Sequence, residues 1–197
     1  MVSKKKLNIS SSELNTIKPI TDNQKEVFAS YEKGQNLFLY GVAGTGKTFV
    51  ALYNALKDVL DPKSPRERVY IVRSLLPTRD IGFLPGDEED KSYLYQVPYQ
   101  NMVRFMFQRG SDAEFDRLYT DLRNQGTIDF LSTSFLRGIT IDNGVIIVDE
   151  CQNLNFHELD TIMTRVGQDT RIIFAGDIQQ TDLTKTNDRN GILDFVN

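Results

Sequence analysis

The fold is decided by the stretch Leu37-Phe38-Leu39-Tyr40-Gly41-Val42-Ala43-Gly44-Thr45-Gly46-Lys47-Thr48. Residues 37–40 form a short apolar run, which predicts a buried strand. From Lys47 onward, apolar residues recur three and four positions apart, which predicts a helix packed on a sheet. The turn between them fits the pattern G-x-x-x-x-G-K-[ST] in the strand–turn–helix context that supports such a match. The alternative is a plain glycine-rich turn with a solvated lysine, and this context argues against it. The sequence therefore predicts a phosphate-binding P-loop.

Each residue type in this turn has a physical role in holding a triphosphate. Glycines let the backbone curl so that successive N–H groups point at the anion, and the N-terminus of the following helix adds unpaired donors. Lys47 would place a positive charge near the β- and γ-phosphates, and the Thr48 hydroxyl would ligate Mg²⁺. We therefore expect residues 41–48 to bind ATP, with Lys47 also catalytic and Thr48 also a metal ligand.

The rest of the chain alternates apolar runs with helical patterns. We expect further strands at residues 69–72, 128–131, 145–148 and 171–175, and helices near residues 95–108 and 113–124. Another helix should begin after the cap Asn155, bury Leu159, Ile162, Met163 and Val166, and end at Gly167. Alternating strands and helices imply an α/β fold, with a mostly parallel sheet of about five strands and helices on both faces.

Length and composition describe one ordinary domain. The chain has 197 residues, of which 40% are apolar and 25% charged, as in a soluble globular protein. It contains no long apolar run that would span a membrane, and a single cysteine fits a reducing compartment, so we expect a cytoplasmic protein. Residues 1–18 are basic and polar and predict a flexible arm; residues 19–197 would form the domain. The net charge of −4 does not indicate nucleic-acid binding, although a local basic patch would suffice.

Two carboxylates follow the most apolar of the predicted strands. Asp149 and Glu150 come directly after Val148, and ligands of open α/β sheets bind at the carboxyl ends of strands. Asp149 is suited to hold Mg²⁺, and Glu150 to polarise the attacking water as a catalytic base. The alternative is a strand that simply exits into solvent, which is a weaker interpretation beside a P-loop.

Two further glutamines are candidates. Gln180 lies in the polar cluster after the last strand, where an amide could sense the γ-phosphate with Asp177 in support, although an ordinary turn explains the cluster equally well. Gln24 precedes the first strand and could read adenine through its amide. A helix cap by Thr21 or Asp22 explains most of that segment without a nucleotide.

The order of these motifs resembles superfamily 1 helicase cores and, more narrowly, the PhoH-like ATPases. The resemblance rests on Gln24, the P-loop, Asp149-Glu150-Cys151-Gln152, Gly176-Asp177-Ile178-Gln179-Gln180, the loop Ile81-Gly82-Phe83-Leu84-Pro85-Gly86-Asp87 and Arg137-Gly138-Ile139-Thr140. It implies a RecA-like core, ATP hydrolysis linked to RNA or single-stranded DNA, and assembly into homo-oligomeric rings. It also implies that Gln24 reads the base and that Gln152 and Gln180 link the nucleotide to movement.

The chain departs from the family pattern in three respects. Ser74 stands where the family usually has proline, and Ile139 where it has a second arginine, which weakens the inference of nucleic-acid binding. Relatives also continue past residue 197 with another strand and an arginine-bearing segment. The domain is therefore expected to be a trimmed or minimal version that lacks this C-terminal segment.

Hydrolysis needs positive charge on the γ-phosphate, which an arginine finger supplies in related enzymes. A chain of this length has no second domain to provide one, so we expect a neighbouring subunit of a head-to-tail ring, such as a hexamer, to do so. The candidates are Arg165, Arg171 and Arg189. A competing hypothesis is a nucleotide-gated protein-binding module that hydrolyses ATP slowly.

Aromatic residues cluster in the helical pattern after residue 90. They are Tyr93, Tyr95, Tyr99, Phe105 and Phe107, interleaved with Arg104 and Arg109. Nucleic-acid bases could stack on such rings beside arginines. A helix whose aromatic residues face the core is the favoured interpretation.

Overall fold

The structure is a computed structural model, and it describes residues 9–73, 88–133, 136, 138–177 and 191–196. It contains one sheet of five parallel strands in the order β1-β5-β4-β2-β3. The strands are β1 (Leu37–Tyr40), β2 (Arg68–Arg73), β3 (Ile128–Leu131), β4 (Gly144–Asp149) and β5 (Arg171–Gly176). All their carboxyl ends therefore meet at one edge, where Tyr40 pairs with Gly176 and Arg73 with Asp149.

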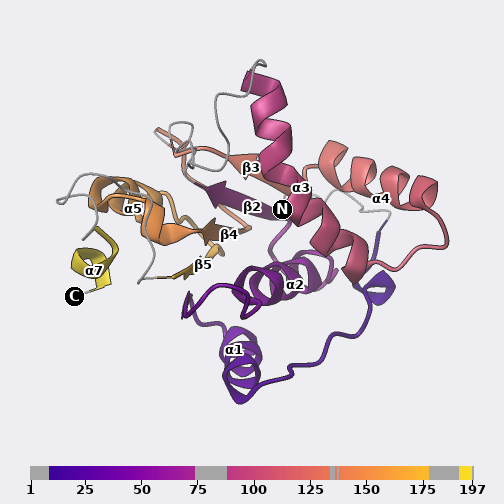
Figure 1. The fold of residues 1–197 in the computed structure, drawn as a ribbon, viewed down its shortest axis with the longest axis horizontal. Coiled ribbons are helices and arrows are strands. Elements are labelled where there is room, and N and C mark those ends of the chain that lie inside the picture. Colours follow the sequence, from indigo (N-terminus) through magenta and orange to yellow (C-terminus); the bar gives the residue numbers. More distant parts are fainter. Residues whose placement is uncertain (1–8, 74–87, 134–135, 137, 178–190, 197) are drawn as a thin grey trace.

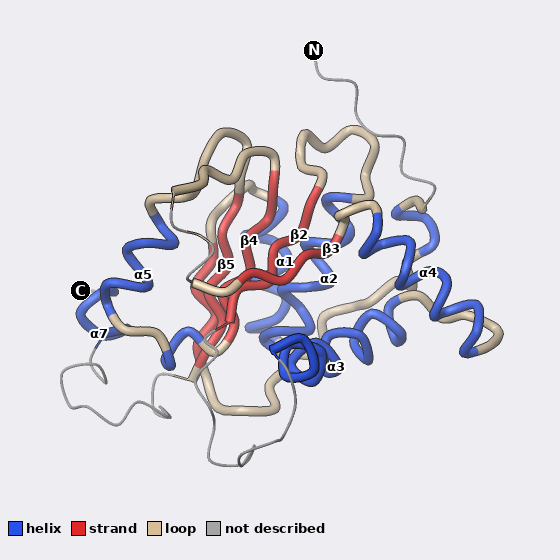
Figure 2. The backbone as a smooth tube through the Cα atoms, turned by 90° about the horizontal axis from the view of Figure 1, so that it is seen from above, coloured by secondary structure: helices blue, strands red, loops and turns tan. Residues whose placement is uncertain are grey.

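Helices cover both faces of the sheet (Figures 1 and 2). One face carries α1 (Asp22–Glu32), α2 (Lys47–Val59), α3 (Glu88–Met106) and α4 (Asp112–Asn124), and the other carries α5 (Phe156–Met163) and α7 (Gly191–Val196). Successive residues of β4 alternate between the two sides: Val145 and Ile147 belong to the first core, and Ile146 and Val148 to the second. A strand buried on both faces has to be apolar throughout, as this one is. The predicted α/β fold, with a parallel sheet of five strands and helices on both faces, is confirmed.

Two predicted helices differ from the structure at their ends. The capping box of Asn155 and Glu158 is confirmed, but α5 ends at Met163 rather than at Gly167, and the side chain of Met163 is exposed. The chain beyond it turns away because its backbone pairs with Ile141, which donates to the carbonyl of residue 165 at 2.8 Å and accepts from Gly167 at 2.8 Å. Helix α3 begins at residue 88, earlier than predicted, and includes a proline at position 98.

Residues 9–18 are docked on the domain, in contrast to the flexible arm expected over residues 1–18. The side chain of Ile9 is buried in the core, and Leu14 and Ile17 pack against it. Asn15 donates from its backbone to the carbonyl of Met106 at 2.8 Å, and from its side chain to that of Phe105 at 2.9 Å. The segment therefore caps the last turn of α3, a contact that its polar composition concealed.

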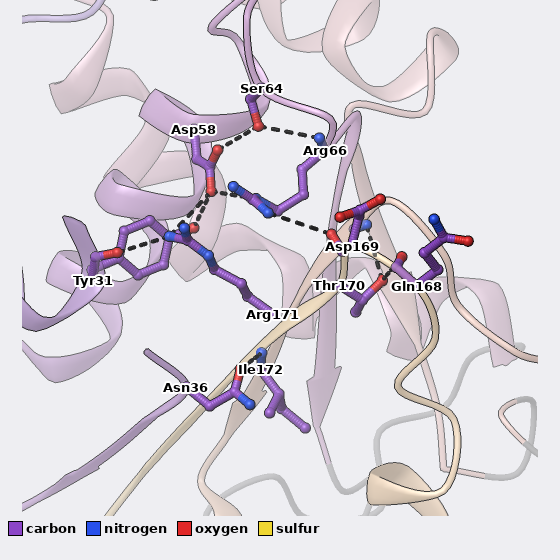
Figure 3. Close-up of polar contacts among 11 residues, drawn as sticks. Tyr31, Asn36, Asp58, Ser64, Arg66, Gln168, Asp169, Thr170, Arg171 and Ile172 are labelled. Atoms are coloured by element: carbon purple, nitrogen blue, oxygen red, sulfur yellow. Dashed lines mark hydrogen bonds and ion pairs between the residues drawn. The ribbon is translucent and has the colours of Figure 1, made fainter. Parts of the chain in front are cut away.

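A polar cluster lies at the amino-terminal edge of the sheet (Figure 3). The carboxylate of Asp58 accepts hydrogen bonds from Tyr31 at 2.8 Å, Ser64 at 2.5 Å and the Arg66 Nε at 2.6 Å, and Arg171 lies 3.6 Å away. We call these five residues the Asp58 cluster. Burial opposes ionisation of Asp58, but the hydrogen bonds outweigh it and hold the pKa of the carboxyl below its ordinary value. The cluster is a compensated ion network that ties α1 and α2 to the starts of β2 and β5.

Candidate active site

The P-loop has the backbone shape that anion binding requires. Gly44 and Gly46 adopt φ values of 79° and 81°, a left-handed conformation that only glycine reaches without strain. A Cβ on Gly44 would meet no atom within 4 Å, so this side of the loop is open. Helix α2 starts at Lys47 without a side-chain cap, whereas Thr21, Ser111 and Asn155 cap their helices. Its first N–H groups therefore lack a side-chain acceptor and are available to an anion.

The Lys47 ammonium lies over this loop. Its Nζ donates to the carbonyl oxygens of Gly41 at 2.8 Å and Val42 at 2.9 Å. These contacts hold the Lys47 ammonium group against the P-loop backbone. Phosphate oxygens of a bound nucleotide could replace the two carbonyl oxygens as hydrogen-bond acceptors. The position suits the role proposed for a P-loop lysine.

Thr48 and Asp149 meet although 101 residues separate them. The Thr48 hydroxyl donates to Asp149 Oδ1 at 2.7 Å, because β4 ends beside the start of α2. The second oxygen, Oδ2, accepts from the hydroxyl of Tyr99 on α3 at 2.5 Å. Burial, followed by the charge of Asp149, raises the pKa of Tyr99 above its ordinary value, so the phenol stays a donor. Asp149 is itself only 6% exposed.

This arrangement fits a divalent cation. Within the described part of the chain, Asp149 forms no direct ion pair with a lysine or arginine, and its two oxygens accept hydrogen bonds from hydroxyl groups. A buried carboxylate without a counter-charge is costly, and a cation would remove that cost. A hydroxyl and a carboxylate are also the oxygen ligands that Mg²⁺ accepts alongside water and phosphate. Thr48 and Asp149 are therefore the residues that would hold it.

Glu150 follows Asp149 in a left-handed conformation with a φ of 49°. Its Oε2 accepts from the Gln152 amide at 2.5 Å, and the amide oxygen of Gln152 accepts from the backbone of Asp177 at 3.0 Å. A Cβ on Gly176 would lie 2.5 Å from that same amide oxygen, so only glycine allows this close approach. Gln152 thus connects the predicted base to the end of β5.

Gln24 lies against the P-loop. Its amide nitrogen is 3.4 Å from the carbonyl of Thr45, and its amide oxygen accepts from the backbone of Ile20 at 2.8 Å. The cap by Thr21 is confirmed, since its hydroxyl accepts from the backbone of Gln24 at 3.2 Å. Asp22 instead pairs with Lys25. Thr21 therefore caps α1, and Gln24 lies next to the P-loop, where its contact with a base stays a prediction.

Lys47, Thr48, Asp149, Glu150 and Gln152 border a cleft of about 300 Å³ at the carboxyl edge of the sheet, whereas Gln24 is not part of its lining. It is lined by Ala43, Gly44, Gly46, Lys47, Thr48, Phe49, Met102, Asp149, Glu150, Gln152, Gly176 and Asp177. The predicted residues Gln180 and Arg137 and the loop at 81–87 lie outside the described residues. The cleft therefore unites the P-loop with the acidic end of β4 and with Gln152.

Helix α3 supplies side chains that sequence reasoning did not assign to this site. Tyr99 and Phe107 are buried, which agrees with a core-facing helix, but the Tyr99 hydroxyl reaches Asp149. Met102, one turn later, lines the cleft beside Phe49, and Phe105 packs edge-on against Phe49 although it is 66% exposed. The sequence offered only the spacing of aromatic residues on this helix, which does not show that the Tyr99 hydroxyl would contact Asp149.

The three arginine candidates are not equivalent. Arg171 donates to the carbonyl of Tyr31 at 2.8 Å and lies over the Tyr31 ring, so it is an internal structural residue rather than a free finger. The Arg165 Nε is buried without a hydrogen-bond acceptor. Arg189 lies outside the described residues. No arginine is found among the described residues that line the cleft.

Comparison with known sequences gives the family. The sequence profile described as "PhoH-like protein" matches residues 16–197. The chain belongs to the PhoH-like family. It is 34% identical over 159 residues to Protein PhoH2 of Bacillus subtilis, covering 80% of this chain and 35% of that protein. It is 33% identical to a PhoH-like protein of Synechocystis, covering 83% and 47%, and 31% identical to Protein PhoH of Escherichia coli K12, covering 82% and 44%. The chain thus spans less than half of each of these relatives.

Two solved structures resemble this chain at low sequence identity. The SWI2/SNF2 ATPase core of Sulfolobus solfataricus in complex with dsDNA has a TM-score of 0.48 and 13% identity, covering 90% of this chain and 36% of that one. Pif1 helicase from Bacteroides in complex with ADP-AlF3 and ssDNA has a TM-score of 0.39 and 18% identity, covering 91% and 37%. In the described part of this PhoH-like chain, no helix is long and apolar enough to cross a bilayer.

Proposed function

We propose that this chain hydrolyses ATP with Mg²⁺ and couples hydrolysis to binding of RNA or single-stranded DNA in a homo-oligomeric ring. The observation that carries the proposal is the 2.7 Å contact between Thr48 and Asp149, which joins the P-loop to the acidic end of β4. Glu150 is the next residue and lines the same cleft. A phosphate cradle, a pair of metal ligands and a base in one cleft are the parts that phosphoryl transfer to water requires.

Each residue has a distinct role in this proposal. The P-loop N–H groups and Lys47 bind the β- and γ-phosphates, and Gln24 contacts the base. Thr48 and Asp149 hold Mg²⁺, which when bound neutralises charge on the phosphate oxygens. Glu150 takes a proton from water as the water oxygen bonds to the γ-phosphorus and the bond to the ADP oxygen breaks.

Variants of the cleft test the enzymatic part. Lys47→Ala removes the charge on the phosphates, so both nucleotide binding and turnover should be lost. Glu150→Gln keeps the size of the side chain but cannot accept the proton, so hydrolysis should fall by roughly 10²–10⁴-fold while ATP still binds. Binding is measured with a fluorescent nucleotide and turnover by phosphate release. Equal loss of binding in both variants would contradict the role of Glu150.

The ATPase rate at different protein concentrations tests the ring, and the rate with added nucleic acid at different salt concentrations tests nucleic-acid binding. Because no described arginine lines the cleft, a neighbouring subunit should supply the finger, and the specific ATPase rate should fall on dilution to nanomolar protein. Single-stranded RNA or DNA should stimulate the rate, and the stimulation should weaken as salt rises, because binding releases counterions. A rate that does not depend on protein concentration would contradict the ring.

A second function is a nucleotide-gated module that binds a protein partner. It is favoured by the 2.5 Å contact of Gln152 with Glu150, because this contact occupies the base and ties it to the end of β5. Such a protein would bind Mg²⁺–ATP, turn it over slowly, and show no stimulation by nucleic acid at any salt concentration.

A further inference from the structure

Tyr99 is a buried side chain of α3 that contacts the proposed metal ligand Asp149. It is 2% exposed, and its hydroxyl donates to Asp149 Oδ2 at 2.5 Å. Its ring packs edge-on against Phe130 of β3, with centroids 5.4 Å apart. The phenol is thus fixed from two sides, by the ring contact with the sheet and by the helix on which it sits.

The two oxygens of the Asp149 carboxylate have different partners. Oδ1 faces the Thr48 hydroxyl, which is the side of the P-loop, and Oδ2 faces Tyr99, which is the side of α3. A carboxylate that is bonded through both oxygens cannot rotate freely about its last bond. A ligand held in one orientation loses less freedom when a metal binds, so the group that fixes the orientation contributes to metal affinity.

A second tyrosine–aspartate pair in the same chain provides the comparison. Tyr31 is 4% exposed and donates to Asp58 at 2.8 Å. Asp58 also accepts a hydrogen bond from Arg66 and has Arg171 nearby. The negative charge of Asp58 is therefore compensated by arginines of the same chain. Among the described residues no lysine or arginine forms a direct ion pair with Asp149, although Lys47 lines the same cleft and Arg73 lies next to Asp149 across the sheet. The carboxylate therefore remains open to a cation from outside.

We propose that Tyr99 is a positioning residue for the metal. By holding Oδ2 of Asp149, it turns Oδ1 toward Thr48 and the place where Mg²⁺ enters with the nucleotide. Tyr99 contacts neither the nucleotide nor the metal in this account, and it acts only through Asp149. The inference rests on the proposed function and adds a residue of α3 to the machinery of the P-loop.

The test is the Mg²⁺ dependence of nucleotide binding in Tyr99→Phe, with Tyr31→Phe as the matched control. A fluorescent ADP analogue is held at fixed concentration and Mg²⁺ is titrated. Loss of a group that orients a metal ligand typically weakens metal binding by roughly 10- to 100-fold, so the half-saturating Mg²⁺ concentration should rise by that factor in Tyr99→Phe. Affinity for the analogue in EDTA should not change, because Tyr99 does not contact the nucleotide. Tyr31→Phe should leave both quantities unchanged.

Several outcomes would overturn the inference. An unchanged half-saturation in Tyr99→Phe, with Mg²⁺-dependent binding intact in the unmodified protein, would refute the role of Tyr99 alone. An equal shift in Tyr31→Phe would show a general loss of rigidity and would also refute it. No Mg²⁺-dependent binding in the unmodified protein would refute the proposed function together with the inference. Melting temperatures verify that each variant folds, and Tyr99→Met, which also lacks a donor, replaces Tyr99→Phe if that variant does not fold.

Discussion

Two shielded aspartates lie at opposite edges of the same sheet, and each accepts a hydrogen bond from a buried tyrosine. At the amino-terminal edge, Asp58 has Arg66 and Arg171 beside it (Figure 3). At the carboxyl-terminal edge, Asp149 has the hydroxyls of Thr48 and Tyr99 and, among the described residues, no lysine or arginine in direct ion-pair contact. Both edges have a tyrosine hydroxyl that donates to an aspartate carboxylate. They differ in the source of the positive charge that compensates the aspartate. The Asp58 cluster is complete within the chain, whereas we propose that a ligand completes the surroundings of Asp149.

The largest contrast is expected in the stability of two matched variants. Asp58→Asn leaves Arg66 and Arg171 shielded from solvent without a counter-charge, so the free energy of unfolding should fall by about 3 kcal/mol. Asp149→Asn removes a buried charge that forms no direct ion pair, so in EDTA it should not lower the free energy of unfolding. Urea denaturation of both variants measures the difference. If only Asp149→Asn lowered the free energy of unfolding strongly, the proposed difference between the two aspartates would be wrong.

Most of the fold could be predicted because its signals are local. The strand at residues 145–148 is an apolar run, and the cap at Asn155 is a three-residue pattern, and both are where the sequence placed them. Asp149 and Glu150 could be placed at the phosphate edge because parallel strands end at the same side of a sheet. The end of α5 could not be predicted, because the chain leaves the helix to pair with Ile141, which lies in a distant segment.

Contacts between distant segments account for the remaining differences. The partner of the Tyr99 hydroxyl lies 50 residues away, and the spacing of aromatic residues on α3 shows only that the ring is buried. The Asp58 cluster joins residues 31, 58, 64, 66 and 171, and no single segment contains its pattern. Arg171 therefore appeared free in the sequence, although it is held inside the chain. Residues 9–18 appeared polar, and three apolar side chains among them are enough to dock the segment.

Acid should weaken the Asp58 cluster. The pKa of Asp58 in the folded state is lowered relative to an unfolded value of about 3.9, so its stabilisation is fully present above that value and is lost as pH falls through the folded pKa. The difference in stability between the unmodified protein and Asp58→Asn should therefore narrow below about pH 4. Urea midpoints between about pH 3 and 6 measure this. A difference that stays constant over that range would contradict the assignment.

The smallest expected effect is that of a single hydroxyl. Ser64→Ala removes one of the hydrogen bonds to Asp58 while both arginines remain, so the free energy of unfolding should fall by about 1 kcal/mol. Mg²⁺-dependent nucleotide binding should be unchanged, because Ser64 belongs to the opposite edge. A loss as large as that of Asp58→Asn would mean that Ser64, rather than charge compensation, holds the cluster together.

The central claim is that a triphosphate and its Mg²⁺ bind where the P-loop meets the end of β4. Calorimetric titration with a non-hydrolysable ATP analogue, with Mg²⁺ and with EDTA, tests it directly on the unmodified protein and on Asp149→Asn. We predict saturable binding that is tighter with Mg²⁺ in the unmodified protein, and no Mg²⁺ effect in Asp149→Asn. Absence of binding, or an identical Mg²⁺ effect in both proteins, would contradict the account.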